Sequence, residues 1–570
     1  MREGNLPRLS LSVVFRAAVS TLSAAYISPR MTSKHLLSNA RIFTACGDEL
    51  STDKNCLLIH GDRIEHVGRV DDDAIREARR RGVQEHDIGG RLISPGFIDG
   101  HMHILLFGGS LVAIDLERCK NLDDIRKTIR EGAAARPDAQ RLICQGWMHS
   151  MTDSKALACD IDDLDERPIF IYAKDLHSAW CSTSALNEME VADMPNPEGG
   201  EIFRDETGKP TGLMSEAAGI QIVWPHLAKV TSREEKLSQI RRAIRTYNAA
   251  GYTGMIELAT DEEIWSLLSE LQSSEGPLTL RIVVHWLITP SKTTAESIAQ
   301  VDRAIELHKQ YNLSTSPNLR VAGIKIIGDG VVDACTASLC EPYTSPSVNA
   351  DPIWTYEQLL PVVQHADAAG LQCALHAIGD NTVAHAVQAL SALGKGRNRR
   401  HRIEHLELTS PEDARRLGEY GITASIQPVH ADPAIFGAWP RLIGPGRCKR
   451  AFAYKEFADG GAPLAIGTDA PTAHHLPLRN LYTATTRRSA REEQLTETVN
   501  ENFKLGLGQA LRAASAGAAY SCFADGQVGT LERGKLADFV IIDLDWNAQH
   551  LLKAQVEETW FAGRRIYKKE

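Results

Sequence analysis

The sequence predicts an α/β protein whose central part is a (β/α)8 barrel of parallel strands. Three observations support this class. Short apolar runs alternate with helical patterns through the middle of the 570-residue chain, eight such runs can be counted there, and metal-ligand types of side chain stand at the ends of several. Alternation of this kind is typical of a parallel sheet covered by helices. In a barrel, the strand ends on one face carry metal and catalytic sites.

The eight strand candidates follow one another in order along the middle of the chain. They lie at 92–99, 251–258, 281–288, 321–328, 371–378, 402–407, 423–428 and 463–468. Helical patterns separate them, and the clearest of these are at 259–272, 355–370 and 410–421. We therefore assign residues 95–524 to the barrel.

One gap between strand candidates is far longer than the others and runs from 104 to 250. It contains two strand-like segments and a hairpin-like segment, at 141–147, 168–174 and 199–214. We expect an inserted subdomain after the first barrel strand. It would hang over the active-site end of the barrel.

The two ends of the chain share a sequence pattern typical of short strands and turns. This pattern covers residues 35–94 and returns at 525–570, so we expect both termini to form one composite β-sandwich domain. Residues 1–34 form a leader that is rich in arginine and serine and poor in acids, as an organellar transit peptide is. The alternative is that Met31 is the true start and the leader is disordered or absent. Cytoplasm is the expected location, and the mitochondrion is the alternative.

Composition and charge exclude several classes of protein. The chain is 43% apolar and 24% charged with a formal net charge of −10, which gives no support for nucleic-acid or anionic-membrane binding. Its 11 cysteines show no CxxC pair, so they read as reduced thiols of an intracellular protein. No apolar run approaches the length of a transmembrane helix.

The first candidate ligands are His101 and His103, at the end of the run PGFIDGHMH. Residues i and i+2 of a strand point the same way, so both imidazoles can reach one ion. The pair alone means little, because 20 histidines in 570 positions produce about 0.7 such pairs by chance. The pair becomes evidence for a metal site because a strand precedes it and further ligand candidates follow at later strand ends. The alternative is a pair of unrelated surface histidines.

Lys325 lies among isoleucines on a strand that should be buried. A buried ammonium must find an anion, lose its proton or change chemically, because its desolvation is costly. A neutral lysine can take up carbon dioxide and form a carbamate, whose two oxygens suit a pair of bridged metals. A salt bridge to Asp329 is the alternative, and the sequence leaves both open.

Three further candidates end later strands: His376, His405 and Asp469. Neutral imidazole is a common zinc ligand. A core histidine satisfied by a backbone carbonyl is the alternative for either histidine. The Asp469 carboxylate can contact a metal and accept a proton from water, or it can cap the next helix.

These motifs together resemble the metal-dependent amidohydrolase superfamily, and within it the amidohydrolase family 3 branch that includes N-substituted formamide deformylase. The similarity covers nearly everything from about residue 36 onward. The motifs that carry it include PGFIDGHMH, DLHSAWCSTSAL, GIKIIGDG, LHAIGD, RIEH, SIQP and GTDAP. The resemblance implies a (β/α)8 TIM barrel with a composite β-sandwich.

The resemblance also implies a site. One metal would be held by His101, His103 and Asp469. A second would be held by the histidines at 376 and 405, with a carboxylated lysine at 325 as the bridge. We expect two zinc ions per chain, with manganese, iron or nickel as alternatives.

Two residues of the DLHSAW motif, His177 and Trp180, would project from the insert toward the substrate. A purely structural role is the alternative for both.

The expected activity is hydrolysis of a non-peptide carbon–nitrogen bond of the amide or N-formyl type. Metal coordination lowers the pKa of water toward ~7, so that a metal-bound hydroxide attacks the carbonyl. Asp469 would take the proton and pass it to the leaving nitrogen. A single-metal deaminase or lactone hydrolase on the same fold is the first alternative, and a non-catalytic scaffold is a remote one. The expected partners are a small-molecule amide and a second copy of the chain in a homodimer.

Overall fold

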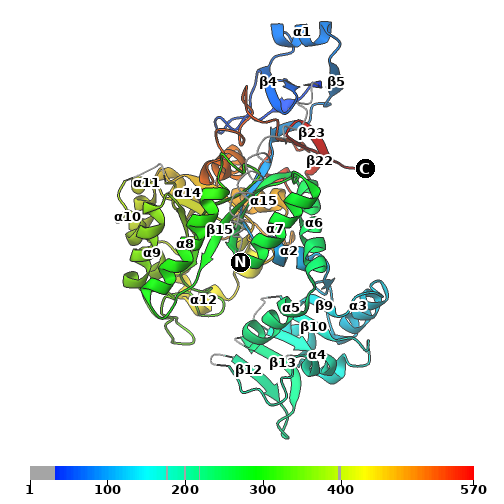
Figure 1. The fold of residues 1–570 in the computed structure, drawn as a ribbon, viewed down its shortest axis with the longest axis vertical. Coiled ribbons are helices and arrows are strands. Elements are labelled where there is room, and N and C mark those ends of the chain that lie inside the picture. The colour runs from blue at the N-terminus through cyan, green and yellow to red at the C-terminus, as the bar shows by residue number, and fades with distance from the viewer. Residues whose placement is uncertain (1–32, 154, 175–177, 198–199, 217, 396–398) are drawn as a thin grey trace, which may run out of the picture.

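The computed structural model describes residues 33–570, apart from 154, 175–177, 198–199, 217 and 396–398. Three parts follow one another along the long axis of the molecule (Figure 1). Sheets built from the two ends of the chain lie at one end, a helix-covered barrel lies in the middle, and an inserted sheet lies at the far end. Most of the predicted leader lies outside the described residues.

The central part is a nearly closed barrel of eight parallel strands, in the order β20-β19-β18-β17-β16-β15-β14-β7. Each of the eight strand candidates corresponds to one of them, which confirms the predicted TIM-barrel class. The first and last strands meet through a bridge between Met102 and Ala470 and a bond from Asp469 N to His101 O of 2.7 Å. The strands are β7 (Phe97–Met102), β14 (Tyr252–Thr260), β15 (Arg281–Ile288), β16 (Leu319–Ile327), β17 (Gln372–Ala377), β18 (Arg402–His405), β19 (Thr423–Ile426) and β20 (Leu464–Ile466).

The first candidate, 92–99, is two strands rather than one. Its first half is β6 (Leu92–Pro95), which belongs to the sheet of the two termini, and β7 begins only at Phe97. Gly96 separates them, and its N–H donates to the carbonyl of Asp538 at 3.1 Å. A Cβ at Gly96 would lie 2.4 Å from the side chain of Thr253. Glycine therefore lets the chain pass close to the barrel wall as it changes sheets.

Helices cover the outside of the barrel, and the three clearest helical patterns of the sequence are among them. Of these, α9 (Tyr356–Ala368) begins with a capping box between Thr355 and Gln358, which satisfies backbone N–H groups at its start. The other two are α7 (Glu262–Glu275) and α11 (Pro411–Tyr420). The remaining helices outside the insert are α1 (Asp73–Arg80), α2 (Ile104–Ser110), α6 (Arg233–Ala249), α8 (Thr294–Gln310), α10 (Asp380–Ser391), α12 (Trp439–Leu442), α13 (Gly444–Cys448), α14 (Tyr454–Asp459), α15 (Pro477–Thr486), α16 (Leu507–Arg512) and α17 (Ala518–Ser521).

Two sheets from both ends of the chain share one core, as the sequence predicts. One sheet has the order β4-β3-β1-β5 and the other the order β2-β6-β21-β22-β23. Leu57 and Ile59 from the first pack with Ile93, Phe539 and Ile541 from the second. The strands are β1 (Lys34–Ser38), β2 (Arg41–Ile42), β3 (Cys56–His60), β4 (Arg63–Gly68), β5 (Gln84–Asp87), β21 (Phe539–Asp543), β22 (Gln555–Phe561) and β23 (Arg564–Lys568).

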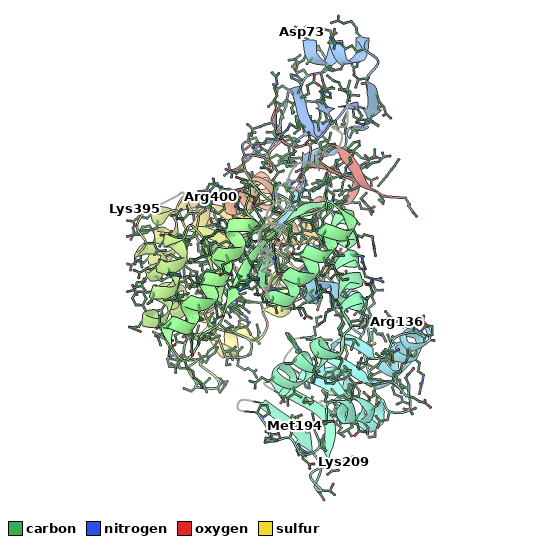
Figure 2. All side chains as sticks on the ribbon, in the orientation of Figure 1. Asp73, Arg136, Met194, Lys209, Lys395 and Arg400 are labelled. Atoms are coloured by element: carbon green, nitrogen blue, oxygen red, sulfur yellow. The ribbon has the colours of Figure 1, made fainter. Side chains whose placement is uncertain are left out.

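The insert after the first barrel strand forms a six-stranded sheet in the order β12-β13-β11-β10-β9-β8. It has hydrophobic cores of its own, and Arg136, Met194 and Lys209 mark its outer part in Figure 2. The elements are β8 (Ile114–Asp115), α3 (Leu122–Ala134), β9 (Leu142–Trp147), β10 (Ile169–Ala173), β11 (Ser178–Cys181), α4 (Thr183–Glu188), β12 (Gly200–Arg204), β13 (Pro210–Glu216) and α5 (Trp224–Val230). The helices on either side of it, α2 and α6, contribute to the barrel core. The residue limits that divide the chain into domains stay predictions.

The contacts between the parts orient the barrel. Arg281, the first residue of β15, forms an ion pair with Asp538 beside β21, so the sheets of the termini lie at the amino ends of the barrel strands. The insert lies at the opposite end of the molecule (Figure 1), toward the carboxyl ends, where barrels carry their sites. Among the helices of the described residues, none combines the length and the apolar character that a membrane-crossing segment needs.

Candidate metal centre

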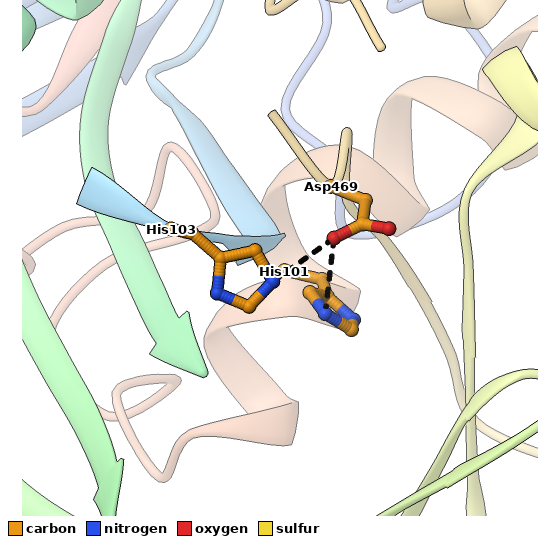
Figure 3. A group of neighbouring side chains, drawn as sticks. All are labelled: His101, His103 and Asp469. Atoms are coloured by element: carbon orange, nitrogen blue, oxygen red, sulfur yellow. Dashed lines mark ion pairs between the residues drawn. The ribbon is translucent and has the colours of Figure 1, made fainter. Parts of the chain in front are cut away.

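Two histidines and one carboxylate meet where the first and last barrel strands come together (Figure 3). His101 lies on β7, His103 follows that strand, and Asp469 follows β20. The same carboxylate oxygen, Asp469 Oδ1, lies 3.4 Å from His101 Nε2 and 3.1 Å from His103 Nε2. Their ligand atoms all lie within 4.8 Å of one another. The geometry is that of a candidate metal site with two nitrogens and one oxygen.

Two more histidines surround the same point. The ring centroid of His405 lies 4.9 Å from that of His101 and 4.3 Å from that of His376. In the described part of the chain, His376 Nε2 and His405 Nδ1 are buried without a hydrogen-bond partner. Leaving such a group unsatisfied costs about 1–3 kcal/mol. A bound cation would remove this cost, so the histidines present fit a metal ligand set.

A fifth histidine, His430, completes a second candidate group with His405 and Asp469. Its Nε2 lies 3.7 Å from Asp469 Oδ2, and its Nδ1 lies 3.1 Å from Glu407 Oε1. The sequence interpretation missed His430 because it stands on a short turn after β19, at Pro428–Ala431, and not on the strand itself. Its place just beyond a barrel strand is the signal that could have found it.

Lys325 is 2% exposed on β16, among the acids of the site. Burial lowers the pKa of its ammonium to about 8, although Glu404 and Asp469 oppose this shift. Within the described residues no ion pair joins Lys325 and Asp329. The Asp329 carboxylate instead accepts from the backbone N–H groups of Ser338, Ile378 and Gly379 at 2.8–3.0 Å. The salt-bridge alternative therefore gains no support, and the carbamate stays a prediction.

Glu404 and Arg402 orient His101 from behind. Glu404 Oε2 lies 2.8 Å from His101 Nδ1, and Arg402 Nε donates to Glu404 Oε1 at 2.6 Å. Burial raises the pKa of the Glu404 carboxyl, but Arg402 and His101 outweigh burial and hold it well below its usual value. An ionised carboxylate on Nδ1 leaves His101 Nε2 free for a metal, as such partners commonly do. Glu404 and His405 are adjacent in RIEH, and only the histidine was singled out from the sequence.

Asp99 ties the first barrel strand to the loop after the last one. Its carboxylate accepts from Tyr247 Oη at 2.9 Å, from Thr468 Oγ1 at 2.6 Å and from the backbone N–H of His101 at 3.1 Å. Burial raises its pKa to about 6, although these bonds favour the charged form. The network holds the His101 and Asp469 backbones side by side.

The backbone at the site is held in a costly conformation. His405 has φ 74° and Asp469 has φ 57°, both in the left-handed region that favours glycine. Each such residue costs on the order of 1–3 kcal/mol, a strain that clusters at functional sites. Burial raises the pKa of the Asp469 carboxyl, but His101, His103 and His405 outweigh burial and keep it well below its usual value. The carboxylate is therefore charged and ready to bind a cation.

Two residues of the insert, His177 and Trp180, were predicted to project toward the substrate. His177 lies outside the described residues. Trp180 is 0% exposed, donates from Nε1 to the carbonyl of Leu157 at 3.0 Å, and packs 5.5 Å from Trp147. The structure favours the structural alternative for Trp180, because its ring is part of the hydrophobic core of the insert.

A barrel with imidazoles and a carboxylate gathered at the carboxyl ends of its strands defines the class of metal-dependent barrel hydrolases. A family model described as Amidohydrolase family matches residues 84–567, and the chain belongs to that family. This confirms the resemblance seen in the sequence.

Relatives cover nearly the whole chain. Protein LONG AFTER FAR-RED 3 of Arabidopsis thaliana is 27% identical over 96% of this chain and 94% of its own. N-substituted formamide deformylase of Arthrobacter pascens is 22% identical over 94% and 98%. A solved structure, described as an uncharacterized metal-dependent hydrolase from Pyrococcus furiosus, superposes with a TM-score of 0.73 at 24% identity and covers 90% of this chain and 99% of that chain. The last similarity shows the shared fold.

Proposed function

We propose that this hydrolase cleaves a non-peptide carbon–nitrogen bond of the amide or N-formyl type with the help of two divalent ions, most simply zinc. One observation carries the proposal: the imidazoles of His101, His103, His405 and His430, from three barrel segments, converge on the Asp469 carboxylate. Two buried imidazole nitrogens at the same place, His376 Nε2 and His405 Nδ1, have no hydrogen-bond partner among the described residues. A set of this kind is costly without a cation.

The ligands divide into two groups. His101, His103 and Asp469 would hold one ion, and His376 and His405 the other. Carbon dioxide would add to the neutral Lys325 amine, which releases a proton and forms an N–COO⁻ group able to bridge the pair. His430 lies close enough to Asp469 to replace or assist a histidine of the second group. A divalent ion bound here supplies Lewis acidity: it lowers the pKa of water and polarises a carbonyl oxygen.

The protein itself supplies proton transfer. Asp469 is ionised, and its two oxygens face different imidazoles, His103 on one side and His430 on the other. It would take a proton from the attacking water as the oxygen bonds to the carbonyl carbon. It would then give that proton to the nitrogen as the carbon–nitrogen bond breaks, which yields a carboxylic acid and an amine.

The remaining expectations belong to the same proposal. All 11 cysteines are free thiols, which supports a reducing compartment such as the cytoplasm. We propose a homodimer as the working state, with a small-molecule amide as the partner of the site.

The test is metal quantification of purified protein together with a panel of amides, N-formyl amines, imides and lactones. We expect close to two ions per chain and hydrolysis of at least one amide or N-formyl amine. His405→Ala should lower the metal content, whereas His365→Ala, a matched change at a half-exposed histidine paired with Asp302, should not. One ion with lactone or deaminase activity would favour the single-metal alternative. Full metal content without activity on any substrate would favour the scaffold.

A further inference from the structure

Two basic residues lie beside the candidate metal centre and take no part in it. His474 is on the loop that follows β20, five residues after Asp469, and Arg491 is on the segment that follows α15. Both residues lie on segments that flank His430: Thr472 Oγ1, two residues before His474, is 3.4 Å from His430 Nε2, and the N–H of Arg491 donates to Asp432, two residues after His430, at 3.2 Å. His430 in turn lies 3.7 Å from the Asp469 carboxylate. The pair therefore stands next to the reacting groups.

The backbone of Arg491 is firmly placed. The wholly buried Asp432, two residues after His430, accepts from the N–H groups of Ala490 at 2.8 Å and Arg491 at 3.2 Å through one carboxylate oxygen. Its other oxygen accepts from the N–H of Ala434 at 2.9 Å. Asp432 is thus engaged with backbone groups and fixes the segment, while the Arg491 side chain is left for another anion.

Three buried polar atoms of the two side chains lack hydrogen-bond partners among the described residues. Both ring nitrogens of His474 and Nε of Arg491 are buried without a hydrogen bond within the described residues, and there no acid forms an ion pair with Arg491. Neighbouring Arg479 is engaged, since it donates to the carbonyl of Ala490 at 2.7 Å and lies 3.9 Å from Glu493. A buried donor without an acceptor costs about 1–3 kcal/mol, and more when it is charged. Both side chains therefore have capacity to receive a ligand.

The charges around His474 and Arg491 determine which ligand charge is favoured there. Burial lowers the pKa of His474 to about 3, and the groups that lower it further are Arg491, Arg479 and His475, all basic. The imidazole is neutral and can donate one N–H, while the guanidinium stays charged and offers a planar set of donors that matches a carboxylate. A cationic group would be repelled, and an apolar group would leave the donors unsatisfied.

We propose that Arg491 and His474 form a subsite for an anionic group of the substrate, so that the enzyme acts on amides or N-formyl amines that also bear a carboxylate. This substrate class rests on the hydrolase function proposed above. The Arg491 guanidinium forms an ion pair with the carboxylate, and the His474 N–H donates a further hydrogen bond to it. The scissile carbonyl is then directed toward Asp469. These bonds remove the unpartnered atoms that the two side chains otherwise present.

The kinetic test uses a matched pair of substrates, N-formylglycine and its neutral methyl ester, with the metal-replete enzyme. Arg491→Gln should lower kcat/KM for N-formylglycine ~10–100-fold, as expected for loss of a charge-assisted hydrogen bond, and change the ester little. Arg491→Lys should retain part of the activity because it keeps the charge. Arg488→Gln is the control, since it makes the same change at an exposed position three residues away.

A binding measurement separates this proposal from the hydrolase function. Calorimetry with N-acetylglycine should give a Kd at least tenfold weaker for Arg491→Gln, and a smaller loss for His474→Asn, while the Arg488→Gln control matches the wild type. The variant dependence excludes a carboxylate that merely ligates the metals. Binding without hydrolysis of any amide would uphold the subsite and remove the hydrolase function. Equal binding by wild type and Arg491→Gln, or no binding by the wild type, would overturn the subsite.

Discussion

The two ends of the barrel differ in how their buried charged groups are partnered, although one atom at the amino end, Arg281 Nε, also lacks a hydrogen bond among the described residues. At the amino ends, Arg281 pairs with Asp538, and Arg320 donates to the carbonyls of Pro317 and Cys522. Asp538 also accepts from the N–H of Ala562 at 2.7 Å. At the carboxyl ends, His376 Nε2 and His405 Nδ1 are buried without a hydrogen bond among the described residues, and the acid nearest to His376 Nε2 is Asp329 at 3.5 Å.

This difference indicates that the amino ends of the barrel contribute to stability and the carboxyl ends carry the function. At the amino ends, the Arg281–Asp538 pair joins the barrel to the sheets of the termini, and the Arg320 guanidinium donates to backbone carbonyls. Groups at the carboxyl ends are held in place but left unsatisfied, and their backbones are strained at His405 and Asp469. Barrels in general place catalysis at the carboxyl ends and stability at the other. The comparison makes separate predictions for each end.

The largest effect is expected from Asp469→Asn at the carboxyl end. The amide keeps a ligand oxygen but cannot accept and pass on a proton, so kcat should fall ~10²–10⁴-fold. Metal content should remain close to that of the wild type. Steady-state kinetics and metal analysis on the same sample check both parts. A variant that turns over at near-normal rates would remove Asp469 from proton transfer.

The next effect is expected from Asp538→Ala at the amino end. The change leaves Arg281 buried beside the barrel without its acid, which should lower the free energy of unfolding by ~3–5 kcal/mol. Metal content of the folded fraction should not change. Denaturant unfolding measures the loss, with Asp545→Ala as the control at an exposed acid. A loss of metal without a loss of stability would reverse the assignment of the two ends.

The sequence alone was sufficient to predict the repeated elements of the fold, the eight barrel strands. Eight apolar runs predicted eight barrel strands because each is buried on both faces and reads as a continuous hydrophobic segment. The same property hid the break at Gly96, because Leu92–Pro95 and Phe97–Met102 are equally apolar and only the packing against Thr253 shows that the chain changes sheets.

The site was predictable only where a ligand ends a strand. His101, His103 and Asp469 do so, and the structure brings them together. His430 was passed over because it stands on the turn after β19 and not at the end of the strand, although its place two residues beyond a strand candidate could have pointed to it. The sequence left two roles open for Trp180, because a tryptophan in a motif can be a ligand contact or a core residue, and its full burial favours the second.

A smaller effect is expected from Glu404→Gln behind the metal site. The amide weakens the orientation of His101, so metal affinity should fall ~10–100-fold, as for other groups that position metal ligands. Competition with a chelator of known affinity measures the change, and Glu412→Gln at an exposed position is the matched control. Unchanged affinity would show that His101 does not depend on this contact.

The smallest effect is expected from Thr355→Ala at the start of α9, outside both ends of the comparison. Loss of the cap should destabilise the protein by ~1 kcal/mol without changing metal content or kcat. Thr355→Ser preserves the hydroxyl and should be near neutral. A drop in activity for the alanine variant would mean that stability and function are not separated as proposed.

The most direct test of the central claim is the anomalous diffraction of a crystal of metal-replete protein at the absorption edge of the bound metal. The account predicts a strong peak between His101, His103 and Asp469 and a second one beside His405. Metal-replete crystals with no peak at these residues, or with peaks only elsewhere on the chain, would contradict it.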